Sequence, residues 1–202
     1  MTLSFAVTWD YRCPFARNVH EHLLNAQAGG ADWDLRYAPF SLGQAHVAEG
    51  ETDVWDEPEK DTGIVALQAG VIVRDRFPDR FPQVHRALFA ARHDEGLKLQ
   101  EPDVVRNVLA ANDVDVDEVF AAIDDGTALK EVQAEHEAVV GSHNVWGVPT
   151  FISGDEAVFV RIMDRAPAGT DQKLSRDTIE RLVKLLDGWP NLNEFKHTSI
   201  KR

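Results

Sequence analysis

The chain contains one cysteine, Cys13, which lies in the stretch T-W-D-Y-R-C-P-F-A-R from Thr8 to Arg17. Pro14 follows it directly, and proline is favoured in the first turn of a helix, where its missing N–H would have no partner. A cysteine at a helix N-terminus meets free backbone N–H groups and the positive end of the helix dipole, both of which favour the thiolate. These residue types indicate a nucleophilic thiol at Cys13.

The charged neighbours of Cys13 act on its thiol in opposite directions. Arg12 and Arg17 would favour the thiolate, whereas Asp10 would oppose it. A buried, inert thiol is the alternative, and lone cysteines are often of that kind. Because Cys13 follows the polar run D-Y-R rather than lying in an apolar stripe, we favour the reactive thiol.

A second pattern, G-V-P-T-F from Gly147 to Phe151, places a proline where a strand begins. Proline is tolerated there because the strand loses only a terminal hydrogen-bond donor. The Val148–Pro149 bond is a candidate for the cis form, which is essentially confined to bonds before proline. An ordinary loop proline is the alternative interpretation of this stretch.

The predicted strands and helices around Cys13 and around G-V-P-T-F decide where these two patterns lie in the fold. Leu3 to Thr8 alternates like a strand, the apolar residues after Pro14 recur at helical spacing up to Gly29-Gly30, and Trp33 to Phe40 alternates again. Strand, helix and strand in this order suit a parallel, right-handed β-α-β unit.

The rest of the chain first turns helical and then returns to strands. After the helices, Thr150–Ile152 and Ala157–Val160 predict a hairpin, and an apolar face from Ser175, taken as the N-cap, predicts a last helix. The pattern therefore favours an α/β protein whose mixed four-stranded sheet is interrupted by a helical block. The predicted helices of that block are Thr62–Arg76, Phe81–Asp94, Glu101–Ala111, Asp115–Ile123 and Thr127–Ser142.

A Cys-Pro pair after the first strand, a helical insertion, and G-V-P-T-F before a hairpin and a last helix resemble the DsbA-like branch of the thioredoxin-like superfamily. This resemblance implies a thioredoxin-like domain from residues 1–45 and 145–202 and a helical insertion domain at 46–144. It also implies that Cys13 is the nucleophile and Pro149 the cis-proline, and that Val148 offers its backbone to a thiol-bearing substrate. The other substrate-binding positions that it implies are Trp9, Tyr11, Pro14, Phe15 and Trp146.

Ala16 departs from the family pattern. Dithiol members carry a resolving cysteine there, which attacks the mixed disulfide, and alanine cannot do so. The resemblance therefore implies an external low-molecular-weight thiol, glutathione or mycothiol, as the resolving partner. Kappa-class glutathione transferases and hydroxychromene carboxylate isomerases of the same group usually carry serine at the first position. The tail W-P-N-L-N-E-F-K-H-T, Trp189 to Thr198, resembles the ending of mycothiol-dependent nitroreductase-like members.

The amino-acid composition limits the classes of molecule that the protein is expected to bind. The chain has 21 Lys and Arg against 34 Asp and Glu, a net charge of −13, which disfavours nucleic acid and anionic membrane surfaces. It has no long apolar run and no signal-peptide pattern at its start, so we expect a cytoplasmic protein. The H-E-H run from His20 to His22 is expected at the surface and not on a metal, and motifs for nucleotide binding are missing.

Three functions remain open at this level. The first is a single-cysteine thiol oxidoreductase that acts on a small-molecule thiol or electrophilic substrate. The second is a transferase or isomerase that binds a thiol cofactor without a covalent bond. The third is a binding protein on a thioredoxin-like scaffold, because fold does not dictate function. The oligomeric state is also open, with a homodimer as one alternative.

Overall fold

The computed structural model describes residues 2–189, 191, 192 and 194, which include a mixed four-stranded sheet with strand order β2-β1-β3-β4. β1 pairs in parallel with β2 and antiparallel with β3, and β3 forms an antiparallel hairpin with β4. The β-α-β unit and the hairpin predicted from the sequence are confirmed. The strands are β1 Ser4–Trp9, β2 Asp34–Pro39, β3 Thr150–Ser153 and β4 Glu156–Phe159.

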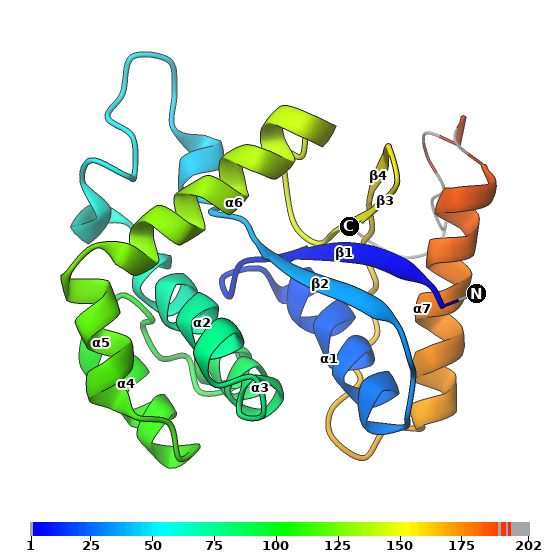
Figure 1. Cartoon of the computed structure of the whole chain (residues 1–202), viewed down its shortest axis with the longest axis horizontal. Helices are drawn as coiled ribbons and strands as arrows, with labels where there is room; N and C mark the ends of the chain where they lie inside the picture. The colour runs from blue at the N-terminus through cyan, green and yellow to red at the C-terminus, as the bar shows by residue number, and fades with distance from the viewer. Residues whose placement is uncertain (1, 190, 193, 195–202) are drawn as a thin grey trace.

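Helices cover both faces of this sheet. α1 (Pro14–Ala28) connects β1 to β2 and packs along α7 (Gln172–Gly188) on one face, while α6 (Thr127–His143) crosses the other (Figure 1). Strand β1 is consequently buried from Phe5 to Trp9, and only Ser4 at its start is exposed. A strand buried on both faces needs a nearly continuous apolar run, which F-A-V-T-W supplies.

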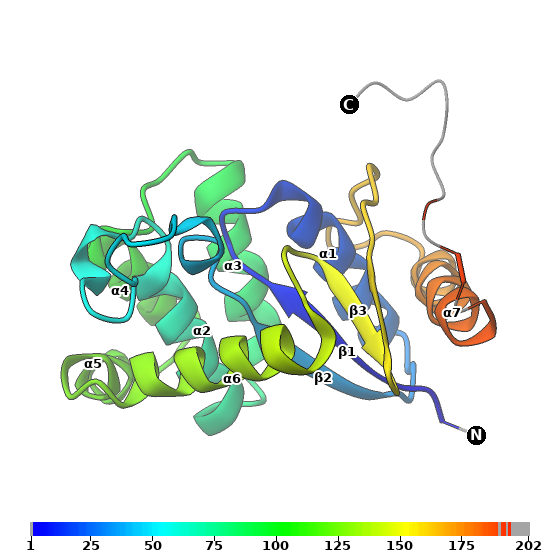
Figure 2. The same ribbon diagram turned by 90° about the horizontal axis from the view of Figure 1, so that it is seen from above.

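The segment between β2 and β3 is helical, as predicted. Helix α2 is buried on nearly all sides and is surrounded by α3, α5 and α6, which explains why it lacks a polar face (Figure 2). The block packs on the sheet through contacts of α6 with β2 and of α3 with α1. Whether it is a separate domain stays a prediction. Its elements are the 3-10 turns Gln44–His46 and Pro58–Lys60, then α2 Ile64–Arg76, α3 Phe81–His93, α4 Pro102–Ala111, α5 Val116–Asp124 and α6.

Two expectations about helix ends and faces were wrong. Asp171, not Ser175, caps α7, because its carboxylate accepts hydrogen bonds from the backbone of Lys173 and Leu174. Ser175 instead lies buried inside the first turn, where its hydroxyl meets the ring of His22 at 3.2 Å. His20 and His22 are therefore buried rather than exposed, because α1 is covered by the sheet, α3 and α7.

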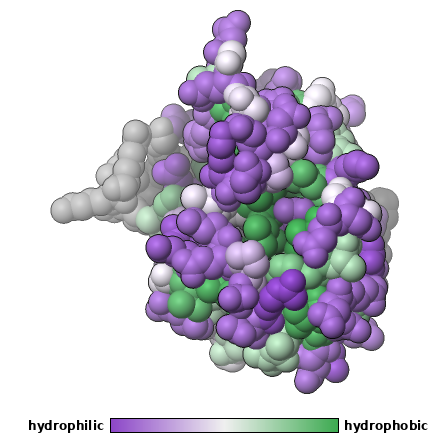
Figure 3. Space-filling view, turned by 90° about the vertical axis from the view of Figure 1, so that its left-hand side faces the viewer, coloured by the Kyte–Doolittle hydropathy of each residue, from purple (hydrophilic) through white to green (hydrophobic). Residues whose placement is uncertain are grey.

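The surface on the side of the helical block is mostly polar. On the side of the helical block, hydrophilic residues cover most of the face, and the apolar residues gather near its centre (Figure 3). None of the helices described is long and apolar enough to cross a membrane.

Candidate active site

Cys13 is the N-cap of α1. Its backbone is extended (φ −90°, ψ 117°), and its Sγ accepts a hydrogen bond from the backbone N–H of Ala16 at 3.4 Å. The loop from β1 is closed by a turn in which the N–H of Cys13 donates to the carbonyl oxygen of Asp10 at 3.1 Å. The sequence D-Y-R-C-P therefore folds into a tight connection that places the thiol at the helix start, as predicted.

The other wall of the site comes from the chain before β3. Cys13 Sγ donates to the carbonyl oxygen of Val148 at 3.3 Å, and the Val148–Pro149 peptide bond is cis. Thr8 holds this segment against β1, because its Oγ1 accepts the N–H of Thr150 at 2.8 Å. Residues 135 positions apart in the sequence thus form one site.

Burial raises the pKa of the Cys13 thiol. The side chain is only 8% exposed, and this desolvation outweighs the backbone N–H groups of Ala16 and Phe15, which lower the pKa. The Asp10 carboxylate raises it further, whereas the Arg161 guanidinium acts in the opposite direction. The backbone N–H groups at the helix N-terminus lower this pKa as expected, but loss of water around the sulfur is the larger effect, so the pKa is raised overall.

Neither flanking arginine supplies a free positive charge to the sulfur. Arg12 pairs with Asp10 at 2.7 Å and with Asp61 at 2.9 Å. Arg17 points along α1 to Glu21 and also pairs with Asp94. Each guanidinium is thus neutralised by two carboxylates, and the expectation that both favour the thiolate was wrong.

The remaining residues proposed for substrate binding fall into two groups. Pro14 and Trp146 are exposed and Phe15 is partly buried, so these three side chains remain accessible to solvent near the buried thiol. Trp9 and Tyr11 are fully buried in the core behind the loop, where they pack against each other and His85. Trp9 and Tyr11 therefore support the site from behind rather than offer a surface to a ligand.

A chain of buried hydrogen bonds runs from Tyr11 to the strand that carries Thr8. Tyr11 Oη lies 2.8 Å from His85 Nδ1, His85 Nε2 lies 2.9 Å from His20 Nδ1, and His20 Nε2 lies 3.1 Å from the carbonyl oxygen of Thr8. A carbonyl only accepts, so His20 donates from Nε2, His85 donates to His20, and Tyr11 donates to His85. Both rings are neutral, in agreement with burial that lowers the pKa of His20 to about 4.

Sequence reasoning missed Thr8, His85 and Arg161 at this site. The H-E-H run was the available signal for the histidine chain, but nothing near His85 links it to residues more than sixty positions earlier. In the described part of the chain, no group of three His, Cys, Asp or Glu side chains is arranged to hold a metal ion. What the site offers is a thiol, a backbone carbonyl across from it and a partly open apolar rim.

A cysteine at the start of the first helix, opposite a cis-proline directly before the third strand, defines a thioredoxin-like protein with a helical insertion. Residues 7–166 match the family model described as DSBA-like thioredoxin domain, and the chain belongs to this family.

The chain is also similar to one curated protein and to solved structures. An uncharacterised protein of Mycobacterium tuberculosis, Rv2286c, is 27% identical over 162 residues, which cover 80% of this chain and 69% of that protein. A probable DsbA oxidoreductase of Streptomyces coelicolor, SCO1869, superposes with a TM-score of 0.60 at 13% identity, over 96% of this chain and 93% of the other. The oxidoreductase DsbA of Xylella fastidiosa gives a TM-score of 0.59 at 17% identity, over 93% and 87%. At these identities the structural likeness shows the fold alone.

Proposed function

We propose that this protein is a thiol oxidoreductase that works with one cysteine and an external low-molecular-weight thiol. The observation that carries the proposal is the position of Cys13 Sγ, 3.3 Å from the carbonyl oxygen of Val148 beside the cis peptide bond, with Ala16 where a second thiol would stand. Membership of the DSBA-like family supports thiol chemistry at this position.

The reaction needs two exchange steps. The Cys13 thiolate attacks a disulfide, forms a mixed disulfide and releases one substrate thiolate, which takes up a proton. An external thiolate of the glutathione or mycothiol type then attacks the substrate sulfur, forms a new disulfide and releases the Cys13 thiolate. One half of the substrate disulfide is released as a thiol, the other half ends in a mixed disulfide with the external thiol, and the protein returns to its starting state.

The raised pKa of Cys13 affects how fast the mixed disulfide forms and how fast it is cleaved. A thiol of high pKa is a poor leaving group, although its thiolate is a strong nucleophile. The adduct would form slowly at neutral pH and persist until a second thiol displaces it. This behaviour suits a chain without a resolving cysteine, because the adduct must wait for an encounter with the cofactor thiol.

Mass spectrometry of the intact protein tests the proposal. Incubation with oxidised glutathione, and separately with mycothiol disulfide, should add one thiol at Cys13, and excess reduced thiol should remove it. The Cys13→Ser variant should gain no mass, because it keeps a hydrogen-bonding group but lacks the sulfur. If the native protein forms no adduct with either disulfide at any pH up to 9, the redox proposal fails.

One observation favours the noncovalent alternative. The raised pKa keeps Cys13 protonated, and as a thiol it holds two hydrogen bonds, from Ala16 and to Val148. A transferase or isomerase could use such a group to orient a bound thiol cofactor. In that case Cys13→Ser should keep most of the conjugating activity towards an electrophile such as 1-chloro-2,4-dinitrobenzene, whereas the redox enzyme should lose its activity completely.

A reducing, cytoplasmic compartment remains part of the proposal. The chain holds no second cysteine for an internal disulfide, and the cofactor thiols in question are abundant where thiols are kept reduced. The tail resemblance to mycothiol-dependent proteins lies mostly outside the described residues.

A further inference from the structure

Arg161 reaches the rim of the Cys13 site from the far end of the chain. After β4 ends at Phe159, the N–H of Val160 still donates to the carbonyl oxygen of Pro149 at 3.0 Å, so this segment runs beside the cis-proline. The Arg161 guanidinium then lies over the ring of Phe15, 4.7 Å from its centre. Phe15 is two residues after Cys13, so Arg161 spans the gap between the two walls of the site.

Aromatic rings form a shelf around this guanidinium. Arg161 also lies 5.5 Å from the ring centre of Phe159, and Trp146 packs on Phe159 at 4.7 Å. Trp146 is 68% exposed although it stands only two residues before Val148. We call Phe15, Trp146 and Phe159 the aromatic shelf. An exposed tryptophan at this place offers an apolar surface two residues before Val148, whose carbonyl oxygen faces the thiol.

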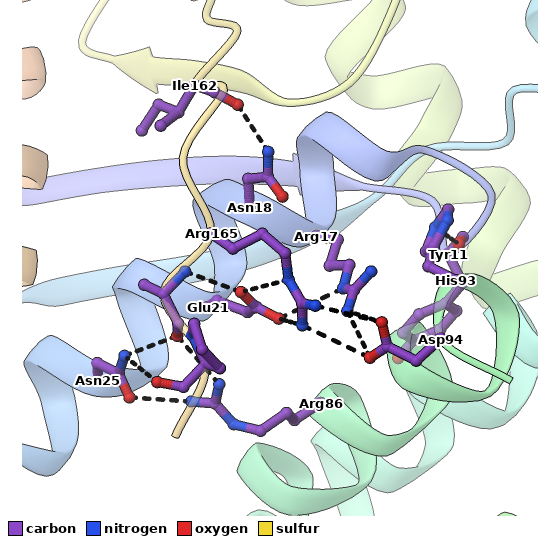
Figure 4. Close-up of polar contacts among 12 residues, drawn as sticks. Tyr11, Arg17, Asn18, Glu21, Asn25, Arg86, His93, Asp94, Ile162 and Arg165 are labelled. Atoms are coloured by element: carbon purple, nitrogen blue, oxygen red, sulfur yellow. Dashed lines mark hydrogen bonds and ion pairs between the residues drawn. The ribbon is translucent and has the colours of Figure 1, made fainter. Parts of the chain in front are cut away.

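The segment that carries Arg161 is clamped to α1. The amide of Asn18 donates to the carbonyl oxygens of Ile162 and Met163, at 2.9 and 3.2 Å. Arg165 pairs with the buried carboxylate of Glu21 at 2.7 Å (Figure 4). Contacts on two successive turns of α1 therefore fix the backbone on which Arg161 stands.

Arg161 differs from its cationic neighbours in its charge balance. Within the described residues it meets aromatic rings and no carboxylate at ion-pair distance, while Arg12, Arg17 and Arg165 each pair with two carboxylates. A cation on an aromatic shelf, open to solvent, is chemically complementary to a carboxylate.

We propose that Arg161 and the aromatic shelf form a subsite that binds the carboxylate of a small thiol or disulfide while its sulfur reacts at Cys13. This inference rests on the proposed function and names its substrate class. It assigns Arg161 a role in specificity: a disulfide with a carboxylate a few bonds from sulfur is preferred over a neutral one. Glutathione belongs to this class, whereas mycothiol carries no carboxylate.

A set of three symmetric disulfides that differ only in charge tests the subsite. 3,3′-Dithiodipropionate is anionic, bis(2-hydroxyethyl) disulfide is neutral and cystamine is cationic, with short linkers of the same kind. The rate of adduct formation at Cys13 is followed by intact mass for the native protein and for Arg161→Gln. The ratio of the anionic to the neutral rate cancels any change in thiolate fraction that the substitution causes.

We expect Arg161→Gln to lower this ratio about two- to fivefold, the range of one exposed ion pair, and Arg161→Glu to make cystamine the preferred disulfide. Arg106→Gln is the matched control, because Arg106 also stacks on a ring, that of Phe120 at 3.7 Å, but in the helical block. Added salt should reduce the preference of the native protein.

The outcomes separate the two proposals. If no disulfide forms an adduct, the proposed oxidoreductase function fails. If all three react but the ratio is the same in the native protein, Arg161→Gln and Arg106→Gln, the function stands and the carboxylate subsite is refuted.

Discussion

The Cys13 sulfur lies between two backbone groups with opposite preferences. The N–H of Ala16 donates to it at 3.4 Å and suits a thiolate, whereas the carbonyl oxygen of Val148 at 3.3 Å accepts a hydrogen bond that only the protonated thiol can donate. With burial added, the protonated form is favoured. The site therefore keeps the Cys13 thiol protonated, and the thiolate fraction at neutral pH is small.

Alkylation of Cys13 should consequently depend steeply on pH. We expect the rate with iodoacetamide to rise through pH 8.5, the ordinary pKa of cysteine, without the plateau near neutral pH of an acidic thiol. Arg161→Gln should shift the profile to still higher pH, because Arg161 lowers the pKa of this thiol, while Arg106→Gln should leave it unchanged. A plateau below pH 7 would contradict the burial argument.

Ala16→Cys should convert the chain to a dithiol protein. Ala16 is fully buried one turn after Cys13, so the added sulfur would cost about 1–3 kcal/mol of stability through crowding. Under oxidising conditions we expect a disulfide between positions 13 and 16, seen as the loss of two hydrogen atoms, and no lasting adduct with external thiols.

Ala26→Cys provides the control for that substitution. Ala26 is equally buried in the same helix, but it lies about 20 Å along the axis from Cys13 and cannot pair with it. If Ala16→Cys still accumulates mixed disulfides as the native chain does, then the missing second thiol does not explain the monothiol behaviour.

At the scale of elements, the buried hydrogen-bond chain from Tyr11 through His85 and His20 joins α3, α1 and the loop before Cys13. Helix α2 approaches so closely that a Cβ at Gly70 would lie 2.4 Å from Tyr11 Oη. The helical block thus packs directly on the loop that positions the thiol. Motion of α3 relative to the sheet would have to break this chain.

His85→Phe should destabilise the fold by about 2–5 kcal/mol, because it leaves the Tyr11 hydroxyl and His20 Nδ1 buried without partners. The double variant with Tyr11→Phe should cost less than the sum of the single changes, because one orphaned group is removed with its partner. Urea unfolding measures both, with Arg92→Gln at an exposed position of α3 as control. Strictly additive losses would show that the two side chains are not coupled.

The helices and strands could be predicted well from the sequence, whereas the residues that pack against one another in the folded chain could not. Periodicity located α2 to α6 to within a few residues, because each amphipathic or apolar run has its own local signal. The sequence analysis placed His20 on the surface, and the family resemblance placed Trp9 at the substrate. Both side chains are buried, because burial depends on which helix covers which face. The pKa of Cys13 was misjudged for this reason: the dipole is local, whereas desolvation is supplied by distant residues.

At the scale of the whole molecule, buried neutral histidines make the free energy of unfolding depend on pH. Burial lowers the pKa of His20 and of His136 to about 4, and it lowers the pKa of His85 as well. In the unfolded chain these rings take up a proton near pH 6.5. Between pH 6.5 and about 4 the unfolded state therefore binds more protons, so stability is complete above this range and falls as pH decreases through it.

The free energy of unfolding should fall by about 1.4 kcal/mol per pH unit for each such histidine near pH 5. Urea unfolding between pH 7.5 and 5 measures this slope above the range where carboxylates titrate. His136→Gln should reduce the slope by the contribution of one ring, since glutamine can still accept the N–H of Ser41 that His136 Nδ1 accepts at 3.1 Å. His143→Gln, at a partly exposed ring, serves as control, and equal slopes in both variants would contradict the assignment.

The contact between Cys13 and Val148, which lie far apart in the sequence, also affects the chain while it is synthesised on the ribosome. The thiol is translated 135 residues before the carbonyl that faces it, so a nascent chain displays an uncovered cysteine until β3 emerges and pairs with β1. During that interval the sulfur is open to oxidants and to other nascent chains, without the desolvation that keeps it protonated in the finished protein. The thiol is masked only after about three quarters of the chain has been synthesised.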